Sequence, residues 1–451
     1  MPDMGLQTYI KMRKFKADYL FTGKEMAEEG SVLVTNDQGA VETILPAAEA
    51  GENIESLAGL LTPGFVNCHC HLELSHMKGV LPERTGLVDF LLSVIRGRGV
   101  TSTGNSPGSP GSSPAGILNA ITAAEDSMLH NGIVAVGDIC NTTLTLPQKA
   151  QGRLFYHNFI ETMGFIEHTA SDRYAASLDL FKDFAEAYTL PIEANSLVPH
   201  APYSVSPRLF QLIANFPGNH LLTIHNQESP AENLFSQTGQ GDFLRLYQGL
   251  GLDTSFFKGF GTRSMAAYLP YFHRNQTLLL VHNVDTAGED LQWWSEWRDS
   301  QNRLSPDAPR TRPDNPGSHN PGPDQAGPGT ASRGVPNIFF CLCPNANRYI
   351  SGQLPDVELL LRHDCDIVLG TDSLASNHQL DILEEMKTLQ SFFPDLSTAT
   401  LLQWATSSGA KALQLDTVLG SFEPGKQPGV VLIEHIEEGR FSRQSRSQRL
   451  V

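Results

Sequence analysis

The sequence contains little that suits a membrane, a nucleic acid or an oxidising compartment. No apolar run approaches the ~20 residues that a membrane helix needs, and the N-terminal stretch lacks the apolar core of a secretory signal. Its 32 basic residues are outnumbered by 49 acidic ones, so the formal net charge is −17, and phosphate backbones and anionic lipid surfaces are poor partners. Six cysteines among 451 residues give no disulfide framework. We therefore expect a cytoplasmic protein that binds neither membranes nor nucleic acids.

Two stretches lack the apolar residues that would order them. Residues 101–114 (TSTGNSPGSPGSSP) are rich in Ser, Gly and Pro, and residues 302–334 are dense in Pro, Gly, Asp and Asn. Neither can bury enough apolar surface to offset the entropy of ordering. We predict that both are mobile surface insertions.

Apolar runs alternate with amphipathic helical patterns, such as 115–129 and 206–214, over most of the remaining chain. The eight runs are 61–68, 133–139, 154–160, 192–198, 221–225, 277–282, 337–343 and 366–370. Strand–helix alternation with nearly continuous apolar strands predicts a parallel sheet buried on both faces. Eight such units predict an α/β fold, the (β/α)8 or TIM barrel.

The two chain ends do not fit this strand count. Residues 15–45 and 420–436 form short strand patterns with turn signals, and we expect them to pair with each other. The predicted organisation is therefore a composite β domain from 1–61 plus 418–451, beside a barrel spanning 62–417.

Polar residues stand where the predicted barrel strands end. His69 and His71 follow the first strand, His225 ends the fifth, His282 ends the sixth and Asp372 follows the eighth. Catalytic groups of TIM barrels project from the carboxyl ends of strands, and residues i and i+2 of a strand point the same way. Each residue alone is common in structural roles, but their joint placement favours a metal site. Imidazoles with one carboxylate suit zinc or ferrous iron, and an open coordination position makes such a metal catalytic.

Glu228 lies just beyond the fifth strand, in the run His225-Asn226-Gln227-Glu228. A carboxyl group there could give a proton to a ring nitrogen of a substrate. The alternative is an acidic residue at a helix N-terminus, where the helix dipole stabilises it.

With these residues in view, the chain resembles the amidohydrolase superfamily, and within it the branch of purine-nucleoside aminohydrolases. The stretches that carry the resemblance are TPGFVNCHCHLELS from Thr62, PHAPYSVS from Pro199, HNQES from His225, VHN from Val281, CPNANRYISGQLPD from Cys343 and GTDSLASNHQLDILEEM from Gly370. The resemblance implies a (β/α)8 barrel with a small β-sandwich made from both chain ends.

The resemblance also implies site roles. One divalent metal ion would be bound by His69, His71, His225 and Asp372. Zinc is the expected metal, with iron and manganese as alternatives. Binuclear members carry a carboxylated lysine on strand four, and residues 192–199 contain no lysine. Three residues would be catalytic: Glu228 as the proton shuttle, His282 orienting the water, and Asp372 accepting its proton. Candidate substrate-binding residues are Glu73, Glu161, His200, Tyr203 and Arg348.

The resemblance implies hydrolytic deamination of an adenine-type nucleoside. The motifs HAPYSV, VHN and NRYISGQ are similar to those of deaminases for aminodeoxyfutalosine, an adenine nucleoside that carries a benzoate, for which Arg348 is a candidate partner. Two alternatives stay open: hydrolysis of another C–N or C–Cl bond of a heterocycle such as guanine, a triazine or a cyclic amide, and a non-catalytic metal-binding barrel. Barrels of this type often form homodimers, and the sequence leaves the oligomeric state open.

Overall fold

The computed structural model describes residues 12–98, 113–187, 194–303 and 334–451. The predicted mobility of the insertions at 101–114 and 302–334 concerns segments that lie mostly outside the described residues. At one edge of each segment the described residues are helical, because Pro114 begins one helix and Arg303 ends another. The predicted insertion boundaries were therefore slightly too wide.

Eight parallel strands alternate with helices through the described residues that follow the N-terminal domain. They are β7 (Phe65–Cys70), β8 (Ile133–Cys140), β9 (Phe155–Thr162), β10 (Asn195–Pro199), β11 (Leu221–Asn226), β12 (Thr277–His282), β13 (Asn337–Leu342) and β14 (Ile367–Leu369). Hydrogen bonds arrange them in two sheets, β7-β8-β9-β10 and β11-β12-β13-β14. Nearly every residue of these strands is buried, as expected for a sheet that is covered on both faces.

Contacts at two seams join these sheets into the predicted (β/α)8 barrel. Between β10 and β11, the side chain of Asn219 accepts from the backbone N–H of Leu197 (3.0 Å) and donates to its carbonyl oxygen (2.7 Å). Between β7 and the residues that follow β14, Cys70 and Asp372 form a parallel bridge.

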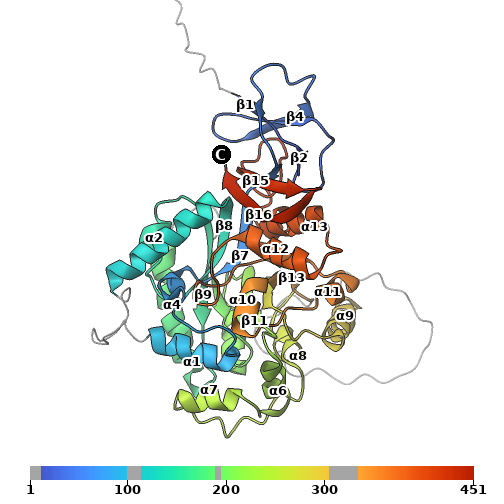
Figure 1. Cartoon of the computed structure of the whole chain (residues 1–451). Helices are drawn as coiled ribbons and strands as arrows, with labels where there is room; N and C mark the ends of the chain where they lie inside the picture. Colours follow the sequence, from blue (N-terminus) through green and yellow to red (C-terminus); the bar gives the residue numbers. More distant parts are fainter. Residues whose placement is uncertain (1–11, 99–112, 188–193, 304–333) are drawn as a thin grey trace, which may run out of the picture.

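Helices and short helical turns surround the barrel (Figure 1). The α-helices are α1 (Leu87–Arg98), α2 (Pro114–His130), α3 (Leu146–Lys149), α4 (Ala170–Ala187), α5 (Pro207–Ala214), α6 (Pro230–Thr238), α7 (Phe243–Gly249), α8 (Ser264–Tyr268), α9 (Gly288–Arg303), α10 (Pro344–Ile350), α11 (Val357–Arg362), α12 (Ile382–Phe392), α13 (Thr398–Gln403) and α14 (Gly409–Ala412). Short 3-10 turns are η1 (Leu72–Met77), η2 (Glu167–Thr169) and η3 (Leu269–Tyr271), and η4 (Trp404–Ser408) is a π-helical turn.

Serine caps set the start of the two helices that the sequence predicted. Ser113 accepts a hydrogen bond from the Gly116 N–H ahead of α2, and Ser206 accepts one from the Leu209 N–H ahead of α5. Both helices have proline at their first position, where its missing N–H costs nothing. Each observed helix begins within one residue of its predicted start.

Two four-stranded sheets form a small domain from both chain ends, seen at the top of Figure 1. One has the order β4 (Val41–Pro46), β3 (Ser31–Thr35), β1 (Arg13–Lys16), β5 (Glu55–Ser56), and the other β16 (Arg440–Arg449), β15 (Val430–Glu437), β6 (Leu60–Pro63), β2 (Tyr19–Leu20). Phe15 and Leu33 of the first sheet share a buried core with Leu61 and Leu432 of the second.

The apolar run at 61–68 was predicted as one strand, and the structure corrects this to two. β6 pairs with β15 in the small domain, whereas β7 pairs with β8 in the barrel. The break falls at Gly64, where a Cβ atom would lie 2.3 Å from Cγ1 of Val134 and 2.6 Å from the Pro428 carbonyl oxygen. Only glycine allows the chain to pass so close to both neighbours.

Among the described residues, none of the helices combines the length and apolar content that crossing a bilayer requires.

Candidate metal and catalytic site

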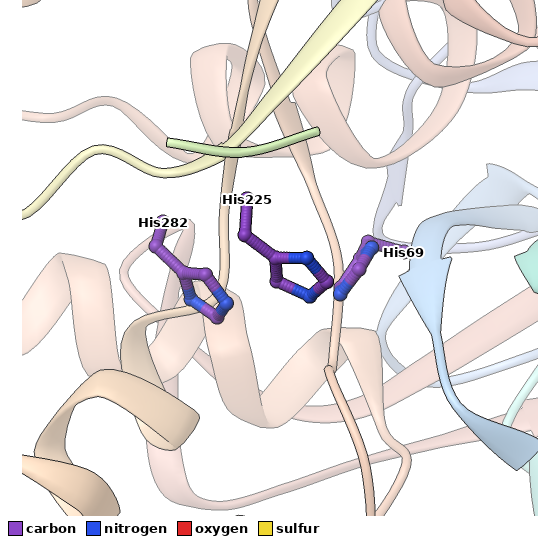
Figure 2. A group of neighbouring side chains, drawn as sticks. All are labelled: His69, His225 and His282. Carbon is purple, nitrogen blue, oxygen red and sulfur yellow. The ribbon is translucent and has the colours of Figure 1, made fainter. Parts of the chain in front are cut away.

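The structure brings the predicted strand-end residues together. We call His69, His71, His225, His282 and Asp372 the strand-end cluster. The ring centroid of His69 lies 4.9 Å from those of His71 and His225 and 5.9 Å from that of His282. Figure 2 shows the rings of His69, His225 and His282 side by side. Oδ1 of Asp372 lies 3.4 Å from Nε2 of His71 and 3.7 Å from Nε2 of His69.

The backbone at these strand ends is strained. His282, Asn283, Asp372 and Gln227 have φ values of 78°, 60°, 56° and 47°, a left-handed region that residues with a Cβ atom rarely adopt. Such strain persists only where the surroundings hold it, and it concentrates at functional sites. Here it turns side chains at the ends of three strands toward one point.

Glycine permits β14 to approach the first barrel strand. A Cβ atom at Gly370 would lie 2.8 Å from Cβ of His69 and 3.0 Å from Sγ of both Cys341 and Cys343. The residues after it bond directly to β7, because the N–H groups of Thr371 and Asp372 both donate to the His69 carbonyl oxygen.

Burial sets the charge of the cluster. Loss of solvation lowers the pKa of His225 to about 3, aided by His200 and His69, and it lowers the pKa of His282 well below its usual value. Burial by itself would raise the pKa of Asp372, but the neighbouring imidazoles of His69, His71 and His282 hold it well below its usual range. Neutral imidazoles beside an ionised carboxylate are the forms that bind divalent metals.

His69 supplies a direct test of whether these residues fit a metal ion. Its side chain is 0% exposed, and neither ring nitrogen has a hydrogen-bond partner among the described residues. A buried polar group without a partner is costly, and a bound cation would remove that cost. Two possible ligand sets include His69, one with His71 and Asp372 and the other with His225 and His282. In each set the ligand atoms lie within 4.8 Å of one another.

Hydrogen bonds orient two of the rings. Nδ1 of His225 lies 2.8 Å from the His200 carbonyl oxygen, so this nitrogen carries the proton and Nε2 presents its lone pair, 3.3 Å from Nε2 of His71. Such a partner behind the ring is typical of metal-binding histidines. Nδ1 of His282 bonds instead to the Asn347 side chain at 2.9 Å, and its Nε2 lies 3.6 Å from Oε1 of Glu228.

Glu228 is buried beside the cluster and is kept protonated. Loss of solvation raises the pKa of its carboxyl group well above the usual value, and the charges of Asp372 and Glu232 raise it further. Glu232, on the first turn of α6, accepts from the backbone N–H of Gln227 (2.8 Å) and of Glu228 (3.3 Å). α6 begins at Pro230 with Ser229 as its N-cap, so Glu228 lies one residue before the cap of this helix, and it also lines the cavity described next.

A cavity of about 880 Å³, including its open mouth, lies over the cluster. His71, His225, His282, Asp372 and Glu228 line its floor, and three predicted substrate-binding residues, Glu161, His200 and Tyr203, line its wall.

The other two predicted substrate-binding residues do not line the cavity. The Glu73 carboxylate accepts from the N–H groups of Asn141 and Thr142, each at 3.1 Å, so it holds the loop after β8. The Arg348 guanidinium lies 5.1 Å from the ring centre of Phe392. Backbone donors thus engage Glu73, and Arg348 lies against an aromatic ring outside the cavity. The substrate-binding roles of these two residues stay predictions.

Several supporting residues escaped the sequence analysis. Asn347 contacts His282, Ser376 donates to Oδ2 of Asp372 (2.6 Å), and Asp138 accepts from the Leu72 N–H (2.8 Å) next to His71. Asp138 interrupts the apolar run 133–139 and could have been found by that signal. Asn347 lies on α10 and Ser376 in the loop after β14, and the sequence does not reveal how either approaches the cluster.

Comparison with known proteins finds similarity to one family. The model of the amidohydrolase family matches residues 330–445. Over these residues the chain is similar to the amidohydrolase family. Its resemblance to that family, argued above from sequence motifs, is thereby confirmed.

Relatives of this chain align with nearly all of its length. Aminodeoxyfutalosine deaminase of a Nitratiruptor species is 24% identical and aligns with 94% of this chain and 91% of its own length. Aminofutalosine deaminase of Helicobacter pylori, solved with methylthio-coformycin, superposes with a TM-score of 0.73 at 20% identity, over 97% of this chain and 100% of its own. An adenosine deaminase of Xanthomonas campestris with bound zinc gives a TM-score of 0.64 at 19% identity, over 93% and 84%.

Proposed function

We propose that this protein is a metal-dependent aminohydrolase that deaminates adenine nucleosides, converting the ring C–NH2 and water into C=O and ammonia. The observation that carries the proposal is geometric: candidate metal ligands, three histidines and Asp372, lie together at the strand ends, and the buried carboxyl group of Glu228 lines the same cavity. Relatives named as deaminases of adenosine and aminodeoxyfutalosine support the same reaction.

One divalent metal would be held by His69, His71, His225 and Asp372. Zinc is the first choice, because three imidazoles with one carboxylate suit it and a structural neighbour was solved with zinc. When bound there, such a metal supplies Lewis-acid activation of water.

The remaining chemistry belongs to the side chains. Glu228, buried and protonated, donates its proton to the ring nitrogen next to the carbon that carries the amine, so negative charge does not build up on that nitrogen. His282 has its Nδ1 fixed by Asn347 and orients the attacking water through Nε2. Asp372, ionised, accepts one proton from the attacking water and passes it to the departing ammonia. As the C=O bond forms, the remaining proton of the added hydroxyl group returns to Glu228 and restores its carboxyl group.

The test is a panel of adenine nucleosides given to purified protein of known metal content. Release of ammonia together with the ultraviolet change from amino- to oxopurine is the expected result for adenosine or a 5′-modified adenosine. Bound metal without ammonia from any adenine nucleoside would contradict the proposal and favour pterins, guanine or halogenated rings.

A further inference from the structure

The cavity over the strand-end cluster is lined by three chemically distinct groups of side chains. Cluster residues and Glu228 form its floor, a polar group of Glu161, His200 and Ser204 lies beside them, with the His200 ring centroid 4.8 Å from that of His225, and the remaining lining is largely apolar. A base that reacts at the floor would place its sugar against the polar wall and its 5′ carbon toward the apolar part.

The polar wall offers acceptors for a sugar diol. Oε1 of Glu161 is buried and accepts no hydrogen bond from the described residues, whereas its Oε2 accepts from the Asn141 side chain at 2.9 Å. Nδ1 of His225 lies 3.8 Å from this oxygen, which is beyond hydrogen-bond distance. A buried carboxylate oxygen without a hydrogen bond is costly, and a ribose hydroxyl donating to it would remove that cost. Nδ1 of His200 bonds to Ser204 at 2.7 Å, which fixes the ring that faces the same zone.

The outer zone is built by two helices that close over the barrel, α1 and α7. Side chains that line the cavity there include Leu87, Phe90 and Val94 of α1, Leu246 and Tyr247 of α7, and Leu250, which directly follows α7. An apolar wall of this kind gains free energy by burying an apolar group of the ligand.

The described part of the outer zone contains no basic side chain that could pair with a negative charge on a ligand. Among the described residues that line the cavity there is no lysine or arginine, whereas Glu161, Glu228 and Asp372 all contribute carboxyl groups. Arg245 of α7 is held by Asp242 (2.9 Å) and by Asp89 of α1, whose second oxygen lies 3.1 Å away. A carboxylate moved from water into such a zone would lose its hydration without gaining an ion pair.

We propose that the preferred substrate is an adenine nucleoside whose 5′ carbon carries an apolar group, and that an anionic 5′ group is selected against. This rests on the proposed function and names its substrate class. It also argues against a benzoate-bearing nucleoside such as aminodeoxyfutalosine as the preferred substrate, because Arg348, predicted to bind that carboxylate, lies outside the cavity.

The test compares kcat/KM for three compounds: adenosine, 5′-deoxy-5′-(phenylthio)adenosine, and the same phenylthio compound with a para carboxylate. The last two differ only in the charged group. We expect the phenylthio compound to exceed both others by about tenfold or more, since a hydrogen-bonding or charged group in an apolar pocket is strongly penalised.

A pair of variants tests whether the zone itself is responsible. Leu250 lines the cavity and is 40% exposed, whereas Leu252 is 39% exposed and does not line it, so both positions tolerate a longer polar side chain. Leu250→Lys should raise kcat/KM for the carboxylate compound relative to the phenylthio compound, and Leu252→Lys should leave that ratio unchanged.

Equal turnover of the two phenylthio compounds by the unmodified protein, or an equal response of both lysine variants, would overturn the proposal while leaving the deaminase function intact. If no compound, adenosine included, released ammonia, the proposed function itself would fail.

Discussion

Among single residues, Glu228 gives the sharpest test of the proposed mechanism, because its proton is needed only when the ring is attacked. Glu228→Gln keeps the size and polarity of the side chain but cannot donate an acid proton. We expect unchanged fold and metal content and a loss of about 10²-fold or more in kcat, the range typical of general acids. Steady-state kinetics on adenosine with metal analysis would check this, and near-normal turnover would refute the role of Glu228.

Glu232 holds the backbone that presents Glu228, and its protonation makes stability depend on pH. Burial raises its pKa from 4.5 to about 7, against the hydrogen bonds from Ser264, Gln227 and Glu228 that lower it. Between these two pH values the folded protein keeps a proton that the unfolded chain has released. The folded state therefore loses stability as pH rises from 4.5 to about 7, by up to about 1.4 kcal/mol per pH unit.

Glu232→Gln cannot titrate, so the contribution of Glu232 to the pH dependence should vanish. Denaturant unfolding of both proteins at intervals from pH 4.5 to 8 would measure this, with the difference in unfolding free energy changing through the window and staying flat above pH 7. A difference that is constant across the whole range would contradict the assignment.

At the scale of elements, a buried ion pair joins α3 to β8 and supports the loop that carries His71. Nζ of Lys149 lies 2.6 Å from Oδ2 of Asp138 and 2.7 Å from Oδ1 of Asn158, and both Lys149 and Asp138 side chains are 0% exposed. Lys149→Met would leave Asp138 charged and buried, so we expect a loss of about 3–5 kcal/mol in unfolding free energy and weaker metal binding.

Lys182→Met is the matched control. Lys182 lies 2.8 Å from Asp179, but its side chain is 65% exposed, so its removal should leave the melting temperature unchanged. Similar melting temperatures for the two variants would show that the buried pair contributes nothing particular.

The close approach of β14 to β7 gives a second prediction at this scale. Gly370→Ala introduces a Cβ atom 2.8 Å from that of His69, and overpacking of this kind costs about 1–3 kcal/mol. We expect a lower melting temperature and weaker metal binding. Gly288→Ala, where the added atom would meet only Leu359 Cδ1 at 3.9 Å, should change neither, and equal effects of both substitutions would contradict the account.

The elements also show which features of the fold and the site could be predicted from the sequence. Apolar runs and amphipathic patterns located the barrel strands and two helices, since both signals are local. The break at Gly64 was missed because it depends on Val134 and Pro428, which are distant in sequence. Glu161, His200 and Tyr203 follow strands and so reach the cavity, whereas the orientation of Arg348 depends on Phe392, and the apolar zone depends on how α1 packs on α7.

At the scale of the whole molecule, both chain ends are tied into one small sandwich. The Val41 N–H donates to the Lys426 carbonyl oxygen at 2.9 Å, and the Gly425 N–H donates to the Val41 carbonyl oxygen at 2.8 Å. The sandwich is continuous with the barrel through β6 and β7, which Gly64 separates. The end of the chain therefore contributes to the framework that holds the first barrel strand, on which His69 lies.

The most direct test of the central claim is a titration of metal-free protein with zinc, in which adenosine deamination and bound metal are measured at each addition. A single metal held by four strand-end ligands predicts activity that is absent without metal, rises in proportion to bound zinc and levels off at one ion per chain. Full activity in the metal-free protein, or activity that continues to rise toward two ions per chain, would contradict a mononuclear metal-dependent aminohydrolase.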